Sequence, residues 1–258
     1  MVTQFKKTSI HYSITGEGKC VVLLHGFLLN TKIWSGLIPL LSKKNKVLAI
    51  DLPGHGKSDC IDEIHSMELL ANLVNFILEE NNITSANLLG HSMGGYVALA
   101  FAEKKPENLK GLCLMNSTSR ADSDEKKTNR DRAIEAVKNN YKTFVRISVS
   151  NLFKPSNRLI LTKEIKEVTK EALKTPLQGI VAALEGMKNR PDRETLLSET
   201  SFKKMMIIGK EDPALDYNSL IEQTQNSDIK VVEFPDGHMS HIENIKEFTY
   251  NILHFIEK

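Results

Sequence analysis

The sequence predicts an α/β fold, a mostly parallel sheet with helices on both faces. Two observations indicate it. Short apolar runs of strand length alternate with longer segments of helical character along the chain. Runs such as 20–24 and 47–50 are continuously apolar, as expected of strands that are covered on both faces. Successive strands joined through helical crossovers favour parallel pairing, so one sheet between two layers of helices is expected.

The N-terminal part of the chain supplies most of this alternation. Strands are expected at 8–15, 20–24 and 47–50, with a loop and a short helix around Trp34 between the second and third strands. The segment 66–80 has apolar residues at helical spacing, so a helix is expected there.

A glycine-rich turn at 90–95 joins the next buried strand to the apolar, helix-forming segment 97–102. Gly90 and Gly94 flank Ser92 at Gly-X-Ser-X-Gly spacing. Small neighbours are needed where the incoming strand and the outgoing helix pass close together. A serine there lies at a helix N-terminus, which favours a developing negative charge. By itself the pattern is weak, because a glycine-rich turn with an incidental serine also fits it.

The alternation stops after a strand expected at 109–115. Helices are expected at roughly 124–151, 157–174 and 176–188, although 144–149 could instead be a strand. This middle segment carries more Lys and Arg than Asp and Glu. Such a basic face is usually solvated, but it could attract an anionic substrate.

The strand pattern returns near the C-terminus. Strands are expected at 204–209 and 229–234, and helices at 216–225 and 244–257. The simplest organisation is an α/β core formed by 1–117 and 196–258, with a helical cap at 118–195 inserted between the sixth and seventh strands. An insertion at the carboxyl edge of a parallel sheet would lie over the crevice where such folds bind ligands.

Composition and charge exclude several classes of protein. The 258 residues are 41% hydrophobic and 26% charged, as in an ordinary soluble globular protein. The net charge of +2 argues against a general nucleic-acid role. No run approaches the roughly 20 apolar residues of a membrane span, and the N-terminus lacks the apolar core of a signal peptide. The three cysteines lack metal-site spacing, so buried free thiols, no metal and a cytoplasmic location are expected.

Five motifs together make a more specific signal than any one of them. Each follows a predicted strand or precedes the last helix, and they are His25-Gly26-Phe27, Asp51 to Ser58, Gly90 to Gly95, Gly209-Lys210-Glu211-Asp212 and Gly237 to Glu243. On these motifs the sequence resembles the α/β-hydrolase family, in its serine-nucleophile, esterase- and lipase-like branch, over nearly the whole chain. The resemblance implies an eight-stranded, mostly parallel sheet and a helical cap.

The resemblance also implies a catalytic triad of Ser92, Asp212 and His238, since the family's chain order is Ser, acid, His. A serine hydroxyl needs a base to take its proton, imidazole suits this near neutral pH, and an acid fixes the imidazole. Glu211 and Asp216 compete with Asp212 for the role of the acid, and Asp212 could instead cap the following helix. The rival base is His241.

The same resemblance assigns the oxyanion hole to the backbone N–H groups of Phe27 and Met93. Donors of this kind are typically worth about 3–4 kcal/mol each. His25, His91 and His241 are possible substrate-pocket residues, although a structural role in tight loops is the more common one for His25, His55 and His91. The Asp51 to Ser58 segment lacks the spacing of a phosphate-binding loop and is expected to shape the floor of the site.

These expectations point to a cofactor-free serine hydrolase that cleaves an ester or thioester of a small-to-medium acyl group through an acyl-enzyme. The same triad serves C–C bond hydrolases, enol-lactonases and perhydrolases described as cofactor-free haloperoxidases, and these remain alternatives. A weakly hydrolytic small-molecule receptor is a further alternative. The expected partner is a small-molecule acyl substrate, with no nucleic acid and no membrane span, and the chain is expected to be a monomer or homodimer.

Overall fold

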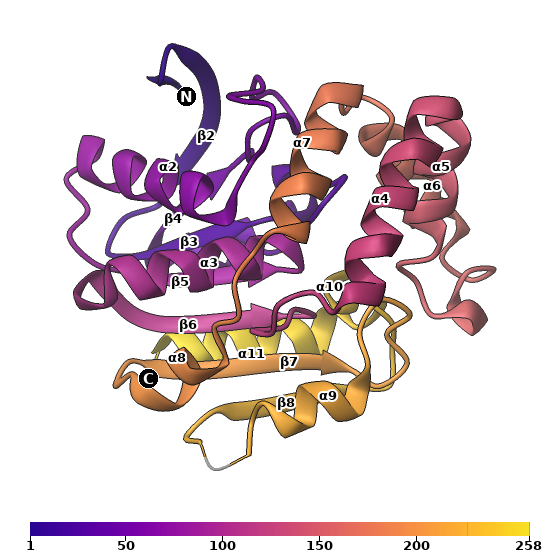
Figure 1. Ribbon diagram of the computed structural model, residues 1–258. Helices are drawn as coiled ribbons and strands as arrows, with labels where there is room; N and C mark the ends of the chain where they lie inside the picture. Colours follow the sequence, from indigo (N-terminus) through magenta and orange to yellow (C-terminus); the bar gives the residue numbers. More distant parts are fainter. Residues whose placement is uncertain (226, 258) are drawn as a thin grey trace.

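The computed structural model describes residues 1–225 and 227–257. Its centre is an eight-stranded sheet with the strand order β1-β2-β4-β3-β5-β6-β7-β8. The strands are β1 Val2–Phe5, β2 Thr8–Thr15, β3 Lys19–Leu24, β4 Asn45–Ile50, β5 Ala86–His91, β6 Leu109–Met115, β7 Lys203–Gly209 and β8 Lys230–Phe234. The pairs β1–β2 and β2–β4 are antiparallel and all later pairs are parallel. The predicted α/β class and mostly parallel sheet are therefore confirmed (Figure 1).

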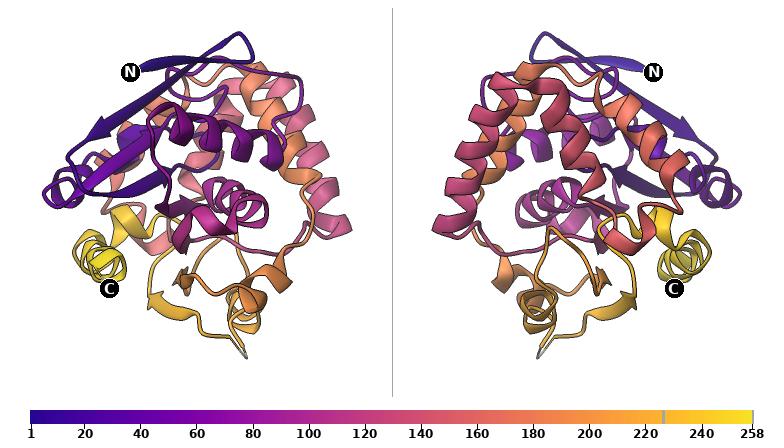
Figure 2. Two further views of the ribbon diagram at one scale, coloured as in Figure 1. Left: turned by 90° about the vertical axis from the view of Figure 1, so that its left-hand side faces the viewer. Right: turned by 90° about the vertical axis from the view of Figure 1, so that its right-hand side faces the viewer.

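Both faces of the parallel strands are buried, which explains their continuous apolar runs. Val22 and Leu24 of β3 belong to a core with the helices α2 (Met67–Glu80) and α3 (Met93–Lys104). Their neighbours Val21 and Leu23 point the other way, into a second core. That core is closed by the 3₁₀ helix η1 (Thr31–Trp34), α1 (Ile38–Leu41) and α11 (Ile245–Glu257). Figure 2 shows the sheet between these two layers.

The chain between β6 and β7, here called the helical insertion, leaves the sheet at the carboxyl ends of the parallel strands (Figure 1). Its helices are α4 Asp124–Asn139, α5 Tyr141–Ser150, η3 Pro155–Asn157, α6 Thr162–Ala172, α7 Leu177–Lys188 and α8 Glu194–Glu199. The single helix expected over 124–151 is broken at Asn140, whose side chain accepts the N–H of Thr143 and caps α5. The alternative strand at 144–149 was wrong, because this segment lies within α5 and buries Val145 and Val149, one helical turn apart.

Among the described strands and α-helices, three short elements were not predicted: β1, α8 and α10 (Ser240–Glu243). Each is too short for its period to stand out, and β1 has only one buried residue, Thr3. The helices α9 (Tyr217–Glu222) and α11 lie within the segments where helices were expected. The 3₁₀ helix η2 (Pro106–Asn108) joins α3 to β6.

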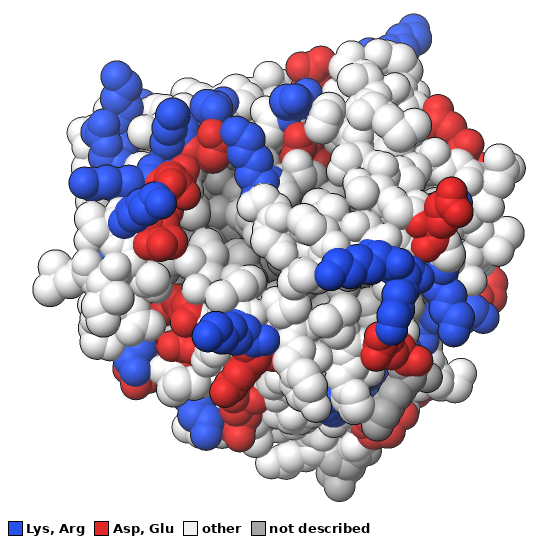
Figure 3. Space-filling view, turned by 180° about the vertical axis from the view of Figure 1, so that it is seen from behind, with Lys and Arg blue, Asp and Glu red and all other residues white. Residues whose placement is uncertain are grey.

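The surface seen in Figure 3 has basic and acidic side chains interspersed, without a broad patch of one sign. Among residues 1–225 and 227–257, no helix has the length and apolar character needed to cross a membrane.

Candidate active site

Ser92 lies between β5 and α3 in a backbone conformation that side-chain-bearing residues rarely adopt, with φ 51° and ψ −117°. The sequence permits this turn because Gly90 and Gly94, two residues before and two residues after Ser92, have no side chain. A Cβ at Gly90 would overlap the backbone of Gly94, and a Cβ at Gly94 would overlap the carbonyl of Leu24 at the end of β3. The glycines therefore let α3 start directly against the sheet and hold Ser92 at the helix N-terminus.

His238 and Asp212 meet across two loops that follow β8 and β7. Nδ1 of His238 lies 2.7 Å from Oδ2 of Asp212, and neither side chain is more than 3% exposed. The second carboxylate oxygen of Asp212 accepts the backbone N–H groups of Ala214 and Leu215, at 2.8 and 3.2 Å. Because an ionised carboxylate only accepts, it fixes Nδ1 as the protonated ring nitrogen and leaves Nε2 free to act as a base.

The two competing acids are occupied elsewhere. Glu211 is exposed and pairs with Lys154 at 2.9 Å. Asp216 caps α9 by accepting the N–H of Ser219 at 2.7 Å. Neither contacts His238 among the described residues.

Asn116, which sequence reasoning did not single out, supports the same carboxylate. It is fully buried at the end of β6, and its Nδ2 donates to Oδ2 of Asp212 at 3.2 Å and to the carbonyl of Gly237 at 3.1 Å. Its position directly after a buried strand, beside the predicted site, is the one signal in the sequence that could have suggested it.

A cavity of about 290 Å³ brings Ser92 and His238 together beneath the helical insertion. This is close to the lower end of the roughly 300–1,000 Å³ of typical ligand sites, so it suits a small ligand. The core contributes Phe27, Leu28, Leu29, His91, Ser92, Tyr96, Ala214, Leu215 and His238; the insertion contributes Asp122, Lys126, Asn129, Arg130, Ala133, Ser148, Leu152, Leu184, Met187 and Arg190.

The backbone around Phe27 and Met93 has N–H groups that are not used in hydrogen bonds within the described part of the protein. Met93 opens α3, where the first N–H groups lack partners within the helix. The N–H of Phe27 also has no hydrogen-bond acceptor among the described residues, and Phe27 lines the cavity. The following Leu28 has φ 62°, a strained value for leucine, and the N–H of Leu29 closes the turn onto the carbonyl of Gly26.

The other predicted histidines differ in their positions. His91 lines the cavity and its Nε2 donates to the carbonyl of His238 at 2.9 Å, which joins the turn at Ser92, here called the elbow, to the loop that carries His238. His25 is buried away from the cavity lining; its Nδ1 donates to the carbonyl of Gly26 and its Nε2 accepts the N–H of Leu52. His241 borders a separate hollow beside α6, and burial together with the nearby His238 lowers its pKa to about 3. His55 is buried and bonds the carbonyl of Pro53.

Glu243 holds the loop that carries His238, and it too was missed from the sequence. Its Oε1 accepts the N–H groups of Gly237 and Met239, on either side of the histidine. Its Oε2 accepts the N–H of Lys154 and the amide of Asn157, both in the helical insertion. Four donors thus converge on one carboxylate that joins the loop to the insertion.

A buried charge cluster, also missed, forms part of the cavity wall. Asp122 lies between Arg130 and Arg190, at 2.5 and 2.7 Å. Burial alone would raise the pKa of Asp122, but the two arginines outweigh it and lower the pKa below its usual value. Only the three-dimensional fold brings these side chains together with Ser92, because their spacing in the sequence matches no motif.

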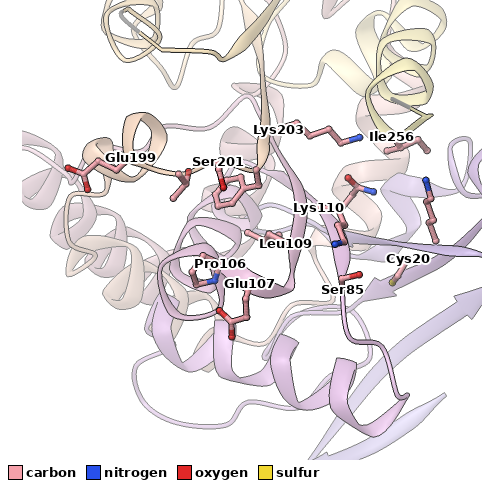
Figure 4. Close-up of a pocket in the computed structure, with 14 residues that line it drawn as sticks. Cys20, Ser85, Pro106, Glu107, Leu109, Lys110, Glu199, Ser201, Lys203 and Ile256 are labelled. Atoms are coloured by element: carbon pink, nitrogen blue, oxygen red, sulfur yellow. The ribbon is translucent and has the colours of Figure 1, made fainter.

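A larger hollow of about 980 Å³ lies at the opposite edge of the sheet (Figure 4). It is lined by residues that begin strands, including Lys19, Leu109 and Lys203. Ligands of parallel α/β sheets bind at the carboxyl ends of the strands, and neither Ser92 nor His238 is near this hollow. We therefore take the smaller cavity as the candidate active site.

No group of three or more His, Cys, Asp or Glu side chains is placed to hold a metal ion within residues 1–225 and 227–257. The cysteines that the structure describes are free; Cys20 and Cys113 are buried and Cys60 is half-buried.

Comparison with known proteins finds a matching family and several similar hydrolases. Residues 19–245 match the family described as alpha/beta hydrolase fold. The pimeloyl-[acyl-carrier protein] methyl ester esterase of Aeromonas hydrophila subsp. hydrophila is 39% identical over 40% of this chain and 39% of its own length. A 2-hydroxy-6-oxononadienedioate/2-hydroxy-6-oxononatrienedioate hydrolase of Pseudomonas putida is 26% identical over 96% of this chain and 92% of its own. The solved structure of a thermophilic esterase from Thermogutta terrifontis, with malate bound, has a TM-score of 0.91 at 29% identity, covering 97% of this chain and 93% of that one. The matches cover less than two thirds of the length of several curated relatives: 66% of the acetoin cleaving system component of Pseudomonas putida, 39% of the Aeromonas esterase and 31% of the uncharacterized protein Rv2715 of Mycobacterium tuberculosis.

Proposed function

The chain belongs to the alpha/beta hydrolase fold family, and from that premise we propose that it is a cofactor-free serine hydrolase acting on an ester or thioester of a small-to-medium carboxylic acid. The observation that carries the proposal is a single cavity bordered by a serine in a strained elbow and by a histidine whose Nδ1 is held by a buried carboxylate. In this proposal the segment 118–195 is the cap that selects the substrate for the core formed by 1–117 and 196–258.

The proposed chemistry is a two-step acyl transfer. Oγ of Ser92 attacks the acyl carbon while Nε2 of His238 takes its proton. The carbonyl oxygen becomes an oxyanion, which accepts the N–H groups of Phe27 and Met93. The imidazolium, stabilised by Asp212, returns the proton to the leaving alcohol or thiol, and an acyl-enzyme remains. Water then attacks the acyl carbon with His238 again as base, releasing the acid and regenerating Ser92.

Two further facts support a small ester. The cavity is only about 290 Å³, which fits a short acyl group better than a long chain. The Aeromonas and Thermogutta proteins are esterases, and the second binds malate, a small organic acid.

The experiment compares the wild type with Ser92→Ala on short-chain aryl acetates and butyrates and labels both with a fluorophosphonate probe. The wild type is expected to turn over the esters and to be labelled at Ser92. The variant is expected to lose the label and at least about 10⁴-fold in kcat, as removal of a nucleophile does elsewhere. Equal turnover by the two proteins would overturn the assignment of the nucleophile.

A C–C bond hydrolase is the second candidate, because the Pseudomonas putida hydrolase matches over nearly the full length of both chains. A vinylogous diketone substrate distinguishes the two functions. If its cleavage exceeds ester hydrolysis in kcat/KM, with the same dependence on Ser92, the second candidate replaces the first.

A further inference from the structure

One face of α4 forms a wall of the cavity that holds Ser92 and His238. Lys126, Asn129, Arg130 and Ala133 all line it, at the i, i+3, i+4, i+7 spacing of a single helix face. Two of these four side chains are cationic. Other charged side chains of α4 lie outside the cavity lining. Lys127, for example, pairs with Asp124 instead.

The charges that border the cavity do not balance. Among the described residues of the lining, Lys126, Arg130 and Arg190 are cationic and only Asp122 is a carboxylate. Asp122 is almost fully buried and contacts both arginines, so its charge is already shared between them. A ligand with a negative charge would compensate the remaining cations.

The two arginines differ in the donors that they leave free. Arg190 donates to the carbonyls of Met187 and Arg120 as well as to Asp122, and its guanidinium lies 4.0 Å above the ring of Tyr96. It is therefore held in place by the protein itself. Arg130 bonds Asp122 through Nε alone, at 2.5 Å.

The two terminal nitrogens of Arg130 have no acceptor among the described residues, and the side chain is 20% exposed. Arg190 thus fixes Asp122, and Asp122 fixes Arg130 with its outer donors uncommitted. A guanidinium in this state presents two parallel N–H groups, the arrangement that matches a carboxylate.

We propose that this face of α4 is a carboxylate subsite, so that the preferred substrate is an ester that also carries a free carboxylate, held by Arg130 with Lys126 beside it. The proposal rests on the proposed ester hydrolysis at Ser92 and names its substrate class. The volume of the cavity, about 290 Å³, limits such a substrate to a short chain between the ester and the carboxylate.

The test uses two matched pairs of alkyl esters that differ in one group. Monoethyl glutarate and ethyl pentanoate have acyl chains of equal length, with the carboxylate of the first replaced by a methyl group in the second. The pair 4-acetoxybutanoate and butyl acetate moves the carboxylate to the alcohol. A pH-stat gives kcat/KM for each, and the measured quantity is the ratio of the anionic to the neutral ester in each pair.

The wild type is expected to favour the anionic ester about tenfold or more in at least one pair, and the pair that shows it identifies the side on which the carboxylate lies. A hydrogen bond to a charged group is worth about 1.5–3 kcal/mol, so Arg130→Gln should reduce that ratio by about 10- to 100-fold, chiefly through KM. Arg130→Lys keeps the charge but loses the fork, and should give an intermediate ratio. Lys127→Gln, which removes a cation from the same helix away from the cavity, should leave the ratio within twofold of the wild type.

Arg130 pairs with a buried carboxylate, so a second variant guards against misfolding of Arg130→Gln. Lys126 is exposed, and Lys126→Gln should lower the ratio severalfold in a folded protein. A wild-type ratio clearly below about tenfold in both pairs, or a folded Arg130→Gln protein with the ratio of the wild type, would overturn the subsite. An equal fall in Lys127→Gln and Arg130→Gln would overturn it as well. In each of these cases Ser92-dependent hydrolysis of the neutral esters would leave the proposed function standing. Absence of any hydrolysis together with no labelling of Ser92 would instead reject the proposed function and the subsite with it.

Discussion

The strained backbone of Ser92 links its proposed role as the nucleophile to the stability of the fold. Its positive φ costs on the order of 1–3 kcal/mol for a residue with a side chain. The surrounding structure supplies that free energy through the close packing that Gly90 and Gly94 permit between β5, α3 and the end of β3. The packing thus maintains the strained backbone that places the hydroxyl at the helix N-terminus.

Glu243 is expected to act on the reaction without touching the substrate. In Glu243→Gln an amide NH₂ would face backbone donors in place of one carboxylate oxygen, so the loop around His238 should shift. We expect kcat on a neutral aryl ester to fall about 10- to 100-fold while KM changes little, because a displaced base affects the chemical step.

The matched control for this prediction is Glu247→Gln, which changes an exposed carboxylate in the first turn of the next helix, α11. It should keep the kcat and the melting temperature of the wild type. A Glu243→Gln protein with unchanged kcat would show that the loop is held in place without the carboxylate.

At the scale of elements, α7 is packed unusually closely on the core. A Cβ at Gly186 would overlap the carbonyl of His65, and one at Gly179 would overlap Gly54. Replacement of glycine by alanine inside a helix usually stabilises by about 0.5–1 kcal/mol. Here we expect the opposite sign: Gly186→Ala should lower the free energy of unfolding by about 1–3 kcal/mol, since α7 must move away from the loop before α2.

Chemical denaturation measures this difference, with Gly36→Ala as the control. A Cβ at Gly36 meets nothing closer than 3.9 Å, so that variant should stay close to the wild type. If Gly186→Ala were as stable as Gly36→Ala, the prediction that α7 has no room for a Cβ at Gly186 would be contradicted.

The sequence predicted those elements whose period is unmistakable. The strands β3, β4 and β6 are covered on both faces, so their apolar runs needed no partner to be recognised. The break at Asn140 was not predicted, because apolar spacing continues across it and only the cap on Thr143 ends one helix and starts the next.

The residues of the candidate site also fall into two groups, those that were predicted from the sequence and those that were not. Ser92, Asp212 and His238 follow strand ends in motifs and were predicted, and their catalytic roles stay a proposal. Asn116, Glu243 and the cluster around Asp122 act through contacts between segments far apart in the sequence, such as Asn116 with Asp212 or Glu243 with Lys154. No periodicity or spacing encodes such pairs, so they became visible only in the structure.

At the scale of the whole molecule, buried neutral histidines make stability depend on pH. Burial is the main cause that lowers the pKa of His55 and His241 to about 3 and that of His65 to about 4. In the unfolded chain these groups titrate near 6.5, so below that pH the unfolded state binds more protons than the folded state. The free energy of unfolding should therefore fall as the pH drops from about 6.5 towards 4, by up to about 1.4 kcal/mol per pH unit for each histidine.

Urea denaturation at pH 7.5, 6 and 5 tests this dependence. His65→Gln, which removes one of the titrating groups, should make it shallower than in the wild type. A free energy of unfolding that is flat between pH 7.5 and 5 would show that these side chains are accessible to protons in the folded state.

The backbone bond from His238 to Leu152 has a consequence for how such a molecule can diversify. The N–H of the histidine donates to a carbonyl of the insertion at 2.8 Å, and Glu243 adds two more links between the same parts. The insertion, which we propose to select the substrate, is thus bonded directly to the loop that carries His238. We therefore expect an insertion transplanted from a relative to place His238 correctly only when residues 236–243 are exchanged together with it.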